Sequence, residues 1–162
     1  MEDTLIPLSQ HKGHQGAPLR IFLVEDSEDV RDLIVENLAE IPGVVLSGYA
    51  ETEDEALRHL LEVSYDVLIL DIQLRQGNGL SLLQSLTRSN TRPQREAKII
   101  FSNHAGATYR RVGKQYGVDH FFDKSSELAL LCDLLEKMSS EDRSDGAYKA
   151  IDAPNSAQPG GL

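Results

Sequence analysis

The sequence predicts an α/β fold in which helices flank a doubly wound, five-stranded parallel sheet, with the element order (βα)5. Two observations support this fold class. Short apolar runs rich in strand-forming residues alternate along the chain with segments whose apolar residues recur at helical spacing. Such alternation favours a parallel sheet covered on both faces, because crossovers between parallel strands are nearly always right-handed.

The five predicted strands are too short to be helices and consist mainly of strand-forming residues. They are IFLV at 21–24, VVL at 44–46, VLIL at 67–70, KIIF at 98–101 and HFF at 120–122.

A segment with an apolar helical face follows each run. The faces consist of Val30, Leu33, Ile34, Leu38 and Ile41; Ala56, Leu57, Leu60 and Leu61; Leu80, Leu83 and Leu86; Tyr109, Val112 and Tyr116; and Leu128, Leu131, Leu134, Leu135 and Met138. The fourth face is weak and the fifth is strong. In the fifth segment Leu130 and Leu134 widen the apolar face, either as a broader core stripe or as a contact surface for a partner or a second copy.

The predicted domain covers residues 19–138, about the length of one typical domain. Residues 1–18 mix Gly, Pro, His and Gln without periodicity, which predicts a flexible lead-in. The segment 139–162 is rich in Ser, Asp, Gly and Pro, so it cannot bury enough apolar surface to fold and we expect a disordered tail. Three apolar residues of the lead-in could instead dock on the domain: Leu5, Ile6 and Leu8.

The chain is acidic, with 16 Lys and Arg against 26 Asp and Glu and a formal net charge of −10. Without a basic run it is poorly suited to direct DNA binding, because phosphate contacts need clustered cations. The single cysteine, Cys132, excludes a disulfide framework and a cysteine-based zinc site. No apolar stretch approaches the ~20 residues that span a bilayer, and the N-terminus lacks a signal-peptide pattern, so we expect a cytoplasmic protein without a membrane segment.

Chemically useful side chains follow four of the five predicted strands. Glu25 and Asp26 end the first, Asp71 the third, Ser102 the fourth and Lys124 the fifth. Because ligands of open parallel sheets bind beyond the carboxyl ends of the strands, these groups should collect at one edge. Each residue alone could be a turn former, a helix cap or a solvated charge, but their joint placement favours a site.

Three carboxylates this close repel one another unless a cation lies between them. Since the chain offers no convincing Cys or His ligand set, we expect Mg²⁺, a hard cation that also accepts phosphate oxygens. Lys124 and Ser102 would face the remaining oxygens of a phosphoryl group. Asp71 is the expected nucleophile, because it stands alone while Glu25 and Asp26 form a pair.

Four segments resemble those of a bacterial response-regulator receiver domain: LRIFLVEDSEDVRDLI, DVLILDIQLRQGNGL, KIIFSNHA and VDHFFDKSSEL. The resemblance implies a flavodoxin-like strand order 2-1-3-4-5. It also implies that Asp71 accepts a phosphoryl group from a phosphohistidine on a sensor histidine kinase or a histidine phosphotransfer protein. Ser102 and Phe121 match the hydroxyl–aromatic switch pair of such domains, and Gly79 matches the glycine that ends the loop after the acceptor.

The same resemblance implies a metal site. Glu25 and Asp26 would hold Mg²⁺ together with Asp71 and the backbone carbonyl of Gln73, with the second acid of the pair in direct contact. Lys124 would pair with the phosphoryl group.

Several positions depart from the usual receiver pattern. The proline common after the lysine is Ser125, which leaves the preceding peptide bond either cis or trans and could N-cap the last helix. The usually small position after the switch hydroxyl is Asn103, which could narrow access to the acceptor or hydrogen-bond the phosphoryl group. Arg75 stands where proline is frequent, and Gln73 and His104 lie where receivers vary residues that tune dephosphorylation.

These features predict a single-domain response regulator of a two-component phosphorelay. We expect it not to be an enzyme and to act by switching a downstream protein target or its own self-association. The predicted homodimer surface is formed by the fourth predicted helix, around residues 109–116, the fifth strand at 120–122 and the fifth predicted helix at 128–138. The basic cluster of Arg110, Arg111 and Lys114 on the fourth helix is either a solvated face or part of that surface.

Two alternative functions come from other classes of protein. The first is a receiver-like adaptor that binds partners without phosphorylation, which the complete set of acidic, hydroxyl and lysine residues disfavours. The second is an Asp-nucleophile phosphatase of the haloacid dehalogenase type, whose DxDx[TV] pattern the stretch VEDSED does not match.

Overall fold

Five parallel strands form the middle layer of the computed structural model, which describes residues 16–89, 96–104 and 106–141. The strands are β1 (Leu19–Val24), β2 (Val44–Ala50), β3 (Val67–Leu70), β4 (Ala97–Ser102) and β5 (His120–Asp123). Their order is β2-β1-β3-β4-β5, and every neighbouring pair is parallel, which confirms the predicted fold class and strand order. The predicted lead-in up to residue 15 and the predicted tail from residue 142 lie outside the described residues.

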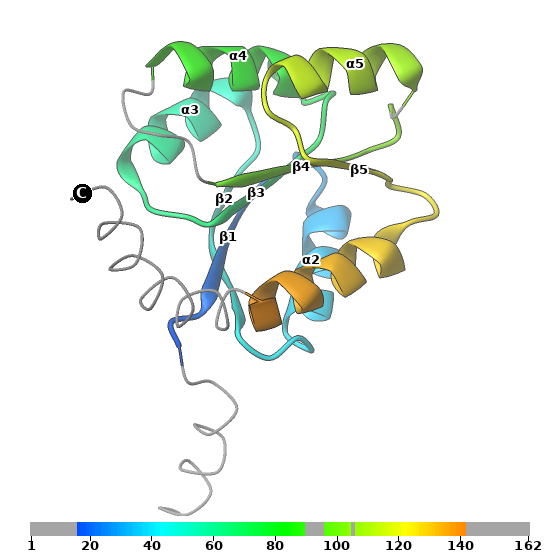
Figure 1. The fold of residues 1–162 in the computed structure, drawn as a ribbon. Coiled ribbons are helices and arrows are strands. Elements are labelled where there is room, and N and C mark those ends of the chain that lie inside the picture. Colours follow the sequence, from blue (N-terminus) through cyan, green and yellow to red (C-terminus); the bar gives the residue numbers. More distant parts are fainter. Residues whose placement is uncertain (1–15, 90–95, 105, 142–162) are drawn as a thin grey trace, which may run out of the picture.

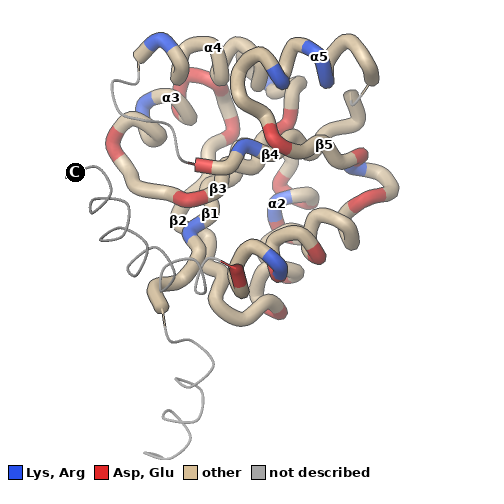
Figure 2. The backbone as a smooth tube through the Cα atoms, viewed as in Figure 1, with Lys and Arg blue, Asp and Glu red and all other residues tan. Residues whose placement is uncertain are grey.

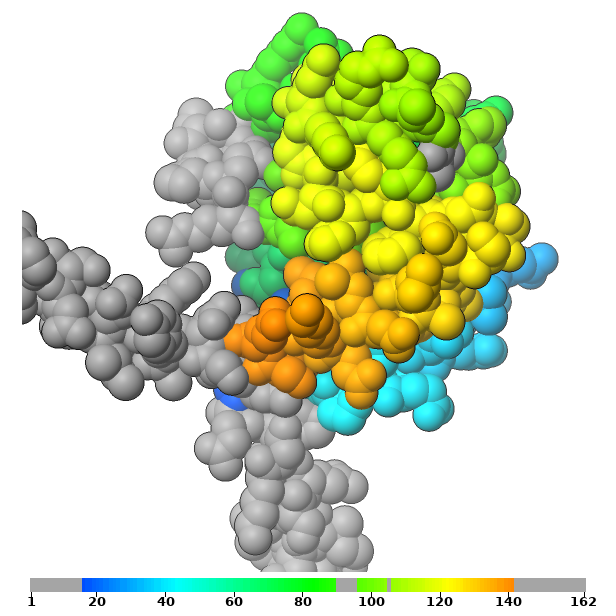
Figure 3. Space-filling model, turned by 45° about the vertical axis from the view of Figure 1, so that its right-hand side comes forward, coloured from blue at the N-terminus to red at the C-terminus, as the bar shows by residue number. Residues whose placement is uncertain are grey.

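Helices cover both faces of this sheet (Figure 1). The named helices are α2 (Glu28–Leu38), α3 (Glu53–Glu62), α4 (Gly79–Ser89) and α5 (Ala107–Gln115), and residues 128–141 form a final helix. Helices α3, α4 and α5 lie on one face, whereas α2 and the final helix lie on the other. In the space-filling view the final helix, in orange, lies against the blue-to-cyan surface formed around α2 (Figure 3).

The two faces bury separate apolar clusters. One combines Phe22 and Leu68 of the sheet with residues of α3 and α4, such as Leu60 and Leu83. The other combines Ile21 and Ile69 with α2 and the final helix. All four residues of β3 are fully buried, as expected for a central strand packed on both faces.

Three residues predicted to be in the core are exposed, namely Leu33 and Leu61, each at 46%, and Tyr109 at 38%. Leu33 and Leu61 directly neighbour the buried Ile34 and Leu60. Because successive helical residues point about 100° apart, only one of each pair can face the sheet. The predicted stripes were therefore too wide at these positions.

The edge strand β2 is longer than predicted and reaches Ala50. Its second half, SGYA, alternates between exposed and covered positions and ends at the buried Ala50, so no apolar run marks it. The register against β1 shifts between Ile21 and Phe22, and the Ser47 hydroxyl donates to the Ile21 carbonyl at 3.1 Å. Because β2 ends at Ala50, Glu51 lies at the carboxyl edge of the sheet.

The two leucines that widen the apolar face of the final helix, Leu130 and Leu134, lie in different environments. Leu131 and Leu135 are buried and Leu134 packs partly against them, whereas Leu130 is 51% exposed. Leu134 therefore belongs to the core stripe and Leu130 does not. The helix continues to residue 141, beyond the predicted boundary at 138, and the buried Ser139 hydroxyl donates to the Pro42 carbonyl at 3.1 Å. No helix in the described part of the chain is long and apolar enough to cross a membrane.

Candidate functional site

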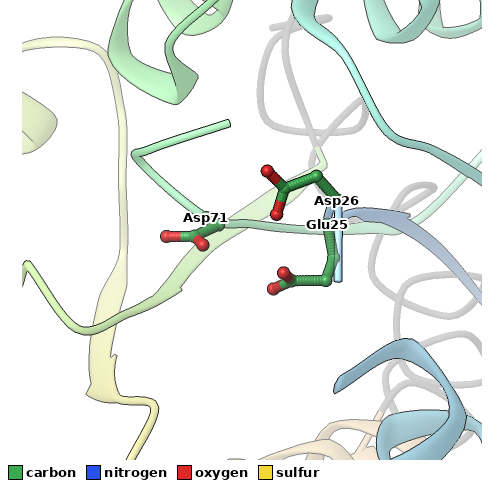
Figure 4. Close-up of side chains that lie close together, drawn as sticks. All are labelled: Glu25, Asp26 and Asp71. Atoms are coloured by element: carbon green, nitrogen blue, oxygen red, sulfur yellow. The ribbon is translucent and has the colours of Figure 1, made fainter. Parts of the chain in front are cut away.

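The carboxyl ends of the strands bring the predicted site residues to one edge of the sheet. Glu25 and Asp26 follow β1 directly, and Asp71 follows β3. Their side chains project to the same side (Figure 4), and one carboxylate oxygen from each lies within 4.8 Å of the others. Ser102 ends β4 and Lys124 follows β5, so the two remaining predicted groups reach the same edge.

Lys124 bridges two of the three carboxylates. Its Nζ lies 2.9 Å from Glu25 Oε1 and 2.6 Å from Asp71 Oδ2. Both acids are buried, with 1% of Glu25 and 6% of Asp71 exposed. Burial raises the pKa of Glu25 above its usual value, although Lys124 acts in the opposite direction. Burial would lower the pKa of Lys124, but its hydrogen bonds to Asp71 and Glu25 outweigh that effect and raise it.

One oxygen of this cluster has no partner. Asp71 Oδ1 is buried and receives no hydrogen bond from the described residues. A buried carboxylate oxygen left unsatisfied destabilises the fold by about 1–3 kcal/mol, so its presence indicates a position for a cation or another ligand. The donors here are all carboxylate oxygens, which are the ligands Mg²⁺ prefers. The residues present therefore fit a magnesium ion held by Glu25, Asp26 and Asp71.

The loop after Asp71 is closed by its own backbone. The Gly79 N–H donates to the Ile72 carbonyl at 2.7 Å, and Gln73 forms an isolated antiparallel bridge with Asn78. A Cβ on Gly79 would lie 2.1 Å from the Asp71 carbonyl oxygen, so only glycine fits at this position. This close approach fixes the backbone that carries Gln73, whose carbonyl is the fourth predicted metal ligand.

Glu53, at the start of α3, holds the far side of the same loop. Its Oε1 accepts a hydrogen bond from the Asn78 N–H at 2.9 Å, and its Oε2 accepts one from the Ser81 hydroxyl at 2.8 Å. Its backbone N–H donates to the Gln76 carbonyl at 2.9 Å. No sequence signal marked Glu53, because residues 53 and 78 meet only in the folded chain.

The predicted switch residues occupy neighbouring strands. The Ser102 hydroxyl is buried and accepts a hydrogen bond from the His104 N–H at 3.1 Å, so its own proton is free to be donated elsewhere. Phe121 on β5 is half-buried against α5, where a Cβ on Gly113 would lie 2.7 Å from its ring. The guanidinium carbon of Arg110 lies 5.4 Å from the ring centroid.

An open depression gives solvent access to the cluster. It is lined by Asp26, Asp71, Gln73, Leu74, Arg75, Asn103 and His104. Across its rim the His104 Nε2 lies 2.6 Å from Gln73 Oε1, and the His104 ring centroid lies 5.8 Å from that of Tyr109. Tyr109, which was predicted in the core, is therefore exposed and contacts the His104 ring.

The peptide bond before Ser125 is trans, since no described bond is cis. The prediction that Ser125 caps the last helix is wrong, because helical structure begins three residues later, at residue 128. Instead, the N–H and hydroxyl of Ser125 both donate to Asp123 Oδ1 and lower the pKa of that carboxyl group. The Glu127 side chain also contacts Asp123, because its Oε1 accepts a hydrogen bond from the Asp123 N–H at 2.7 Å.

A network of ion pairs that the sequence did not predict connects the loop that carries Glu25 with the loop that follows Asp71. The Arg31 guanidinium donates to the Glu25 carbonyl at 3.0 Å and pairs with Glu51 Oε2 at 2.8 Å. Arg75, in the loop after Asp71, pairs with Glu51 Oε1 at 2.9 Å. No spacing rule connects residues 31, 51 and 75, because residue 31 lies on α2, residue 51 follows β2 and residue 75 follows β3.

Comparison with known proteins points to one family. The model of the response regulator receiver domain matches residues 21–136. The chain is 31% identical over 135 residues to protein-glutamate methylesterase/protein-glutamine glutaminase 1 of Rhizobium johnstonii, a match that covers 82% of this chain and 38% of that protein. It is 31% identical over 114 residues to the transcriptional regulatory protein DltR of Streptococcus agalactiae, covering 67% of this chain and 46% of DltR. The chain therefore spans less than half the length of these relatives.

Solved structures share the fold. A two-component response regulator of the LuxR family from Aurantimonas superposes with a TM-score of 0.67 at 23% identity, covering 77% of this chain and 87% of that one. The response regulator domain of Thermotoga maritima CheB gives a TM-score of 0.64 at 21% identity, with coverages of 76% and 95%.

We predict that Gly79→Ala lowers the free energy of unfolding by about 2–3 kcal/mol, because the new Cβ would collide with the Asp71 carbonyl and push the loop outward. Urea denaturation measures this change. Gly106→Ala is the matched control, since a Cβ there meets nothing within 4 Å, and we expect it to stay within about 1 kcal/mol of wild type. Equal losses in the two variants would show that the loop does not depend on this close approach.

Proposed function

The chain belongs to the response regulator receiver family, and we propose that Asp71 accepts a phosphoryl group from a partner's phosphohistidine, with Mg²⁺ bound beside it. The new charge then switches contacts with a downstream protein target or a second copy of the chain. The observation that carries this proposal is the asymmetric environment of Asp71. Lys124 holds one of its oxygens, while the other is buried beside an open depression and has no hydrogen-bond partner among the described residues.

The transfer itself needs little rearrangement of this chain. A carboxylate oxygen of Asp71 attacks phosphorus, an O–P bond forms, and the P–N bond to the donor imidazole breaks. The electron pair of that bond stays with the imidazole, which takes a proton from solvent. Lys124, already within hydrogen-bond distance of Asp71, is placed to neutralise charge on the phosphoryl oxygens.

The metal would be held by Glu25, Asp26, Asp71 and the Gln73 carbonyl. A bound Mg²⁺ would neutralise carboxylate charge and contact phosphoryl oxygens. The two acids of the pair differ in their freedom to contribute. Glu25 is occupied by Lys124 at Oε1 and by the Ser27 N–H at Oε2, whereas the Asp26 side chain forms no ion pair or hydrogen bond within the described residues.

The proposed switch runs from Ser102 to Phe121. A phosphoryl group on Asp71 offers acceptor oxygens, and the free proton of the Ser102 hydroxyl can be donated to one of them. Movement of that hydroxyl toward the acceptor leaves space behind it that the Phe121 ring can fill. Because Phe121 packs against Gly113 and beneath Arg110, its movement would alter the surface of α5.

We predict that acetyl phosphate and Mg²⁺ add one phosphoryl group to the chain, as measured by intact-mass spectrometry. EDTA should abolish the adduct, because the carboxylate charge would then repel the donor. Asp71→Asn should abolish it too, whereas the control Asp32→Asn, an exposed carboxylate on α2, should not. An adduct that survives Asp71→Asn would contradict the assignment. A wild-type chain that no small donor or phosphohistidine protein modifies would instead support the non-phosphorylated adaptor.

We predict that Asp26→Asn weakens Mg²⁺ binding by about tenfold or more, and that Glu25→Gln weakens it less. The reason is that Glu25 is already held by Lys124 and Ser27, while Asp26 is free to ligate. Calorimetric titration with Mg²⁺ measures both affinities. The reverse ranking would show that the buried acid is the direct ligand.

We predict that Ser102→Ala still accepts a phosphoryl group at Asp71 but loses the structural response. With beryllofluoride as the phosphoryl mimic, NMR shifts of the Phe121 ring should change in wild type and much less in the variant. Ser47→Ala serves as the control, because that hydroxyl bonds the Ile21 carbonyl from β2, at the opposite edge of the sheet from β5. If the Phe121 resonances shift equally in Ser102→Ala and wild type, the proposed coupling is wrong.

A further inference from the structure

The geometry points to Arg75 as an anion-recognition residue that attracts and positions the incoming phosphoryl donor at the mouth of the Asp71 depression. This inference rests on the proposed function and names a residue that acts before transfer. Among the described residues that line the depression, Arg75 is the only lysine or arginine.

The electrostatics of the site create the need for such a cation. The three clustered carboxylates outnumber the single ammonium of Lys124, and the chain as a whole carries a net charge of −10. Acetyl phosphate and phosphohistidine are both doubly charged anions near neutral pH. Even a divalent cation bound to the carboxylates would bring this cluster only to neutrality. The opening of the depression therefore repels an approaching phosphoryl donor, or at best does not attract it, unless another positive charge lies on the rim.

Arg75 keeps an available positive charge despite its ion pair. Its partner Glu51 is shared with Arg31, so one carboxylate serves two guanidinium groups and one positive charge is left over. Arg31 is fixed, with only 11% of its side chain exposed, a hydrogen bond to the Glu25 carbonyl, and a position 4.7 Å from the Tyr49 ring centroid. Arg75 is 63% exposed, so it presents the surplus charge to solvent.

Glu51 acts as a positioning residue for this charge. The two guanidinium groups, Arg75 foremost, lower the pKa of Glu51, so it stays ionised at neutral pH and keeps Arg75 on the rim. A planar guanidinium is suited to phosphate oxygens, because it can donate two parallel hydrogen bonds. Arg75 can therefore hold a donor phosphoryl group beside Asp71 until transfer.

The test compares wild type with Arg75→Gln and Arg75→Lys in the full chain. We expect the second-order rate of Asp71 modification by acetyl phosphate to fall about fivefold in Arg75→Gln at low salt, and the difference to shrink at high salt. Arg75→Lys should keep most of the rate, because the charge remains. Arg88→Gln, which removes the same charge from an exposed position in the last turn of α4, should leave the rate unchanged.

Magnesium affinity separates this role from a merely structural one. Removal of a positive charge beside the carboxylates should leave Mg²⁺ binding by Arg75→Gln equal to wild type or tighter, while donor use falls. If Mg²⁺ binding weakens together with the rate, Arg75 supports the loop and the inference is overturned. An unchanged rate in Arg75→Gln overturns the inference alone, whereas a wild-type chain that forms no Asp71 adduct overturns the proposed function and this inference with it.

Discussion

The rest of the site depends on two ion pairs, which the Lys124 ammonium forms with the buried carboxylates of Glu25 and Asp71. Charges placed this far from solvent need partners, yet one lysine cannot satisfy three carboxylates. Among the described residues, this shortfall leaves Asp71 Oδ1 without a donor and the partly exposed Asp26 without a partner. Carboxylate oxygens that are already paired offer nothing to a cation, so the incomplete pairing is what suits this edge of the sheet to a cation.

The sequence predicted this arrangement because it follows from the sheet alone. The all-apolar stretch VLIL and the mostly apolar stretch KIIF predict central strands, and the residues that follow parallel strands meet at the carboxyl edge of the sheet. What it could not predict depends on tertiary contacts. Leu33 and Leu61 fit an apolar helical stripe as well as their buried neighbours do, and only the orientation of the helix against the sheet separates them. The shared pairing of Glu51 with Arg31 and Arg75 has no local signature either.

Two departures from the usual receiver pattern have a common physical consequence. Where proline would stiffen the loops after Asp71 and after Lys124, this chain has Arg75 and Ser125. In both places side-chain contacts replace the missing ring. Arg75 is tied to Glu51, and Ser125 is tied to Asp123 through its backbone and its hydroxyl. Both contacts involve an ionised carboxylate, so the rigidity of these loops depends on charge and on salt in a way that a proline ring would not.

The path from Asp71 to the surface of α5 is short, because the sheet places Ser102 and Phe121 on the adjacent strands β4 and β5. Phe121 has little freedom on its outer side, where Gly113 leaves no room for even a Cβ and Arg110 covers the ring. Helix α5 carries basic residues and no acidic ones (Figure 2). A ring that moves inward would therefore release both a packing contact and a cation–π contact on a positively charged helix. In the proposed switch, a local change in charge at Asp71 would alter the packing of α5 and the exposure of its basic side chains, on a surface that a partner could bind.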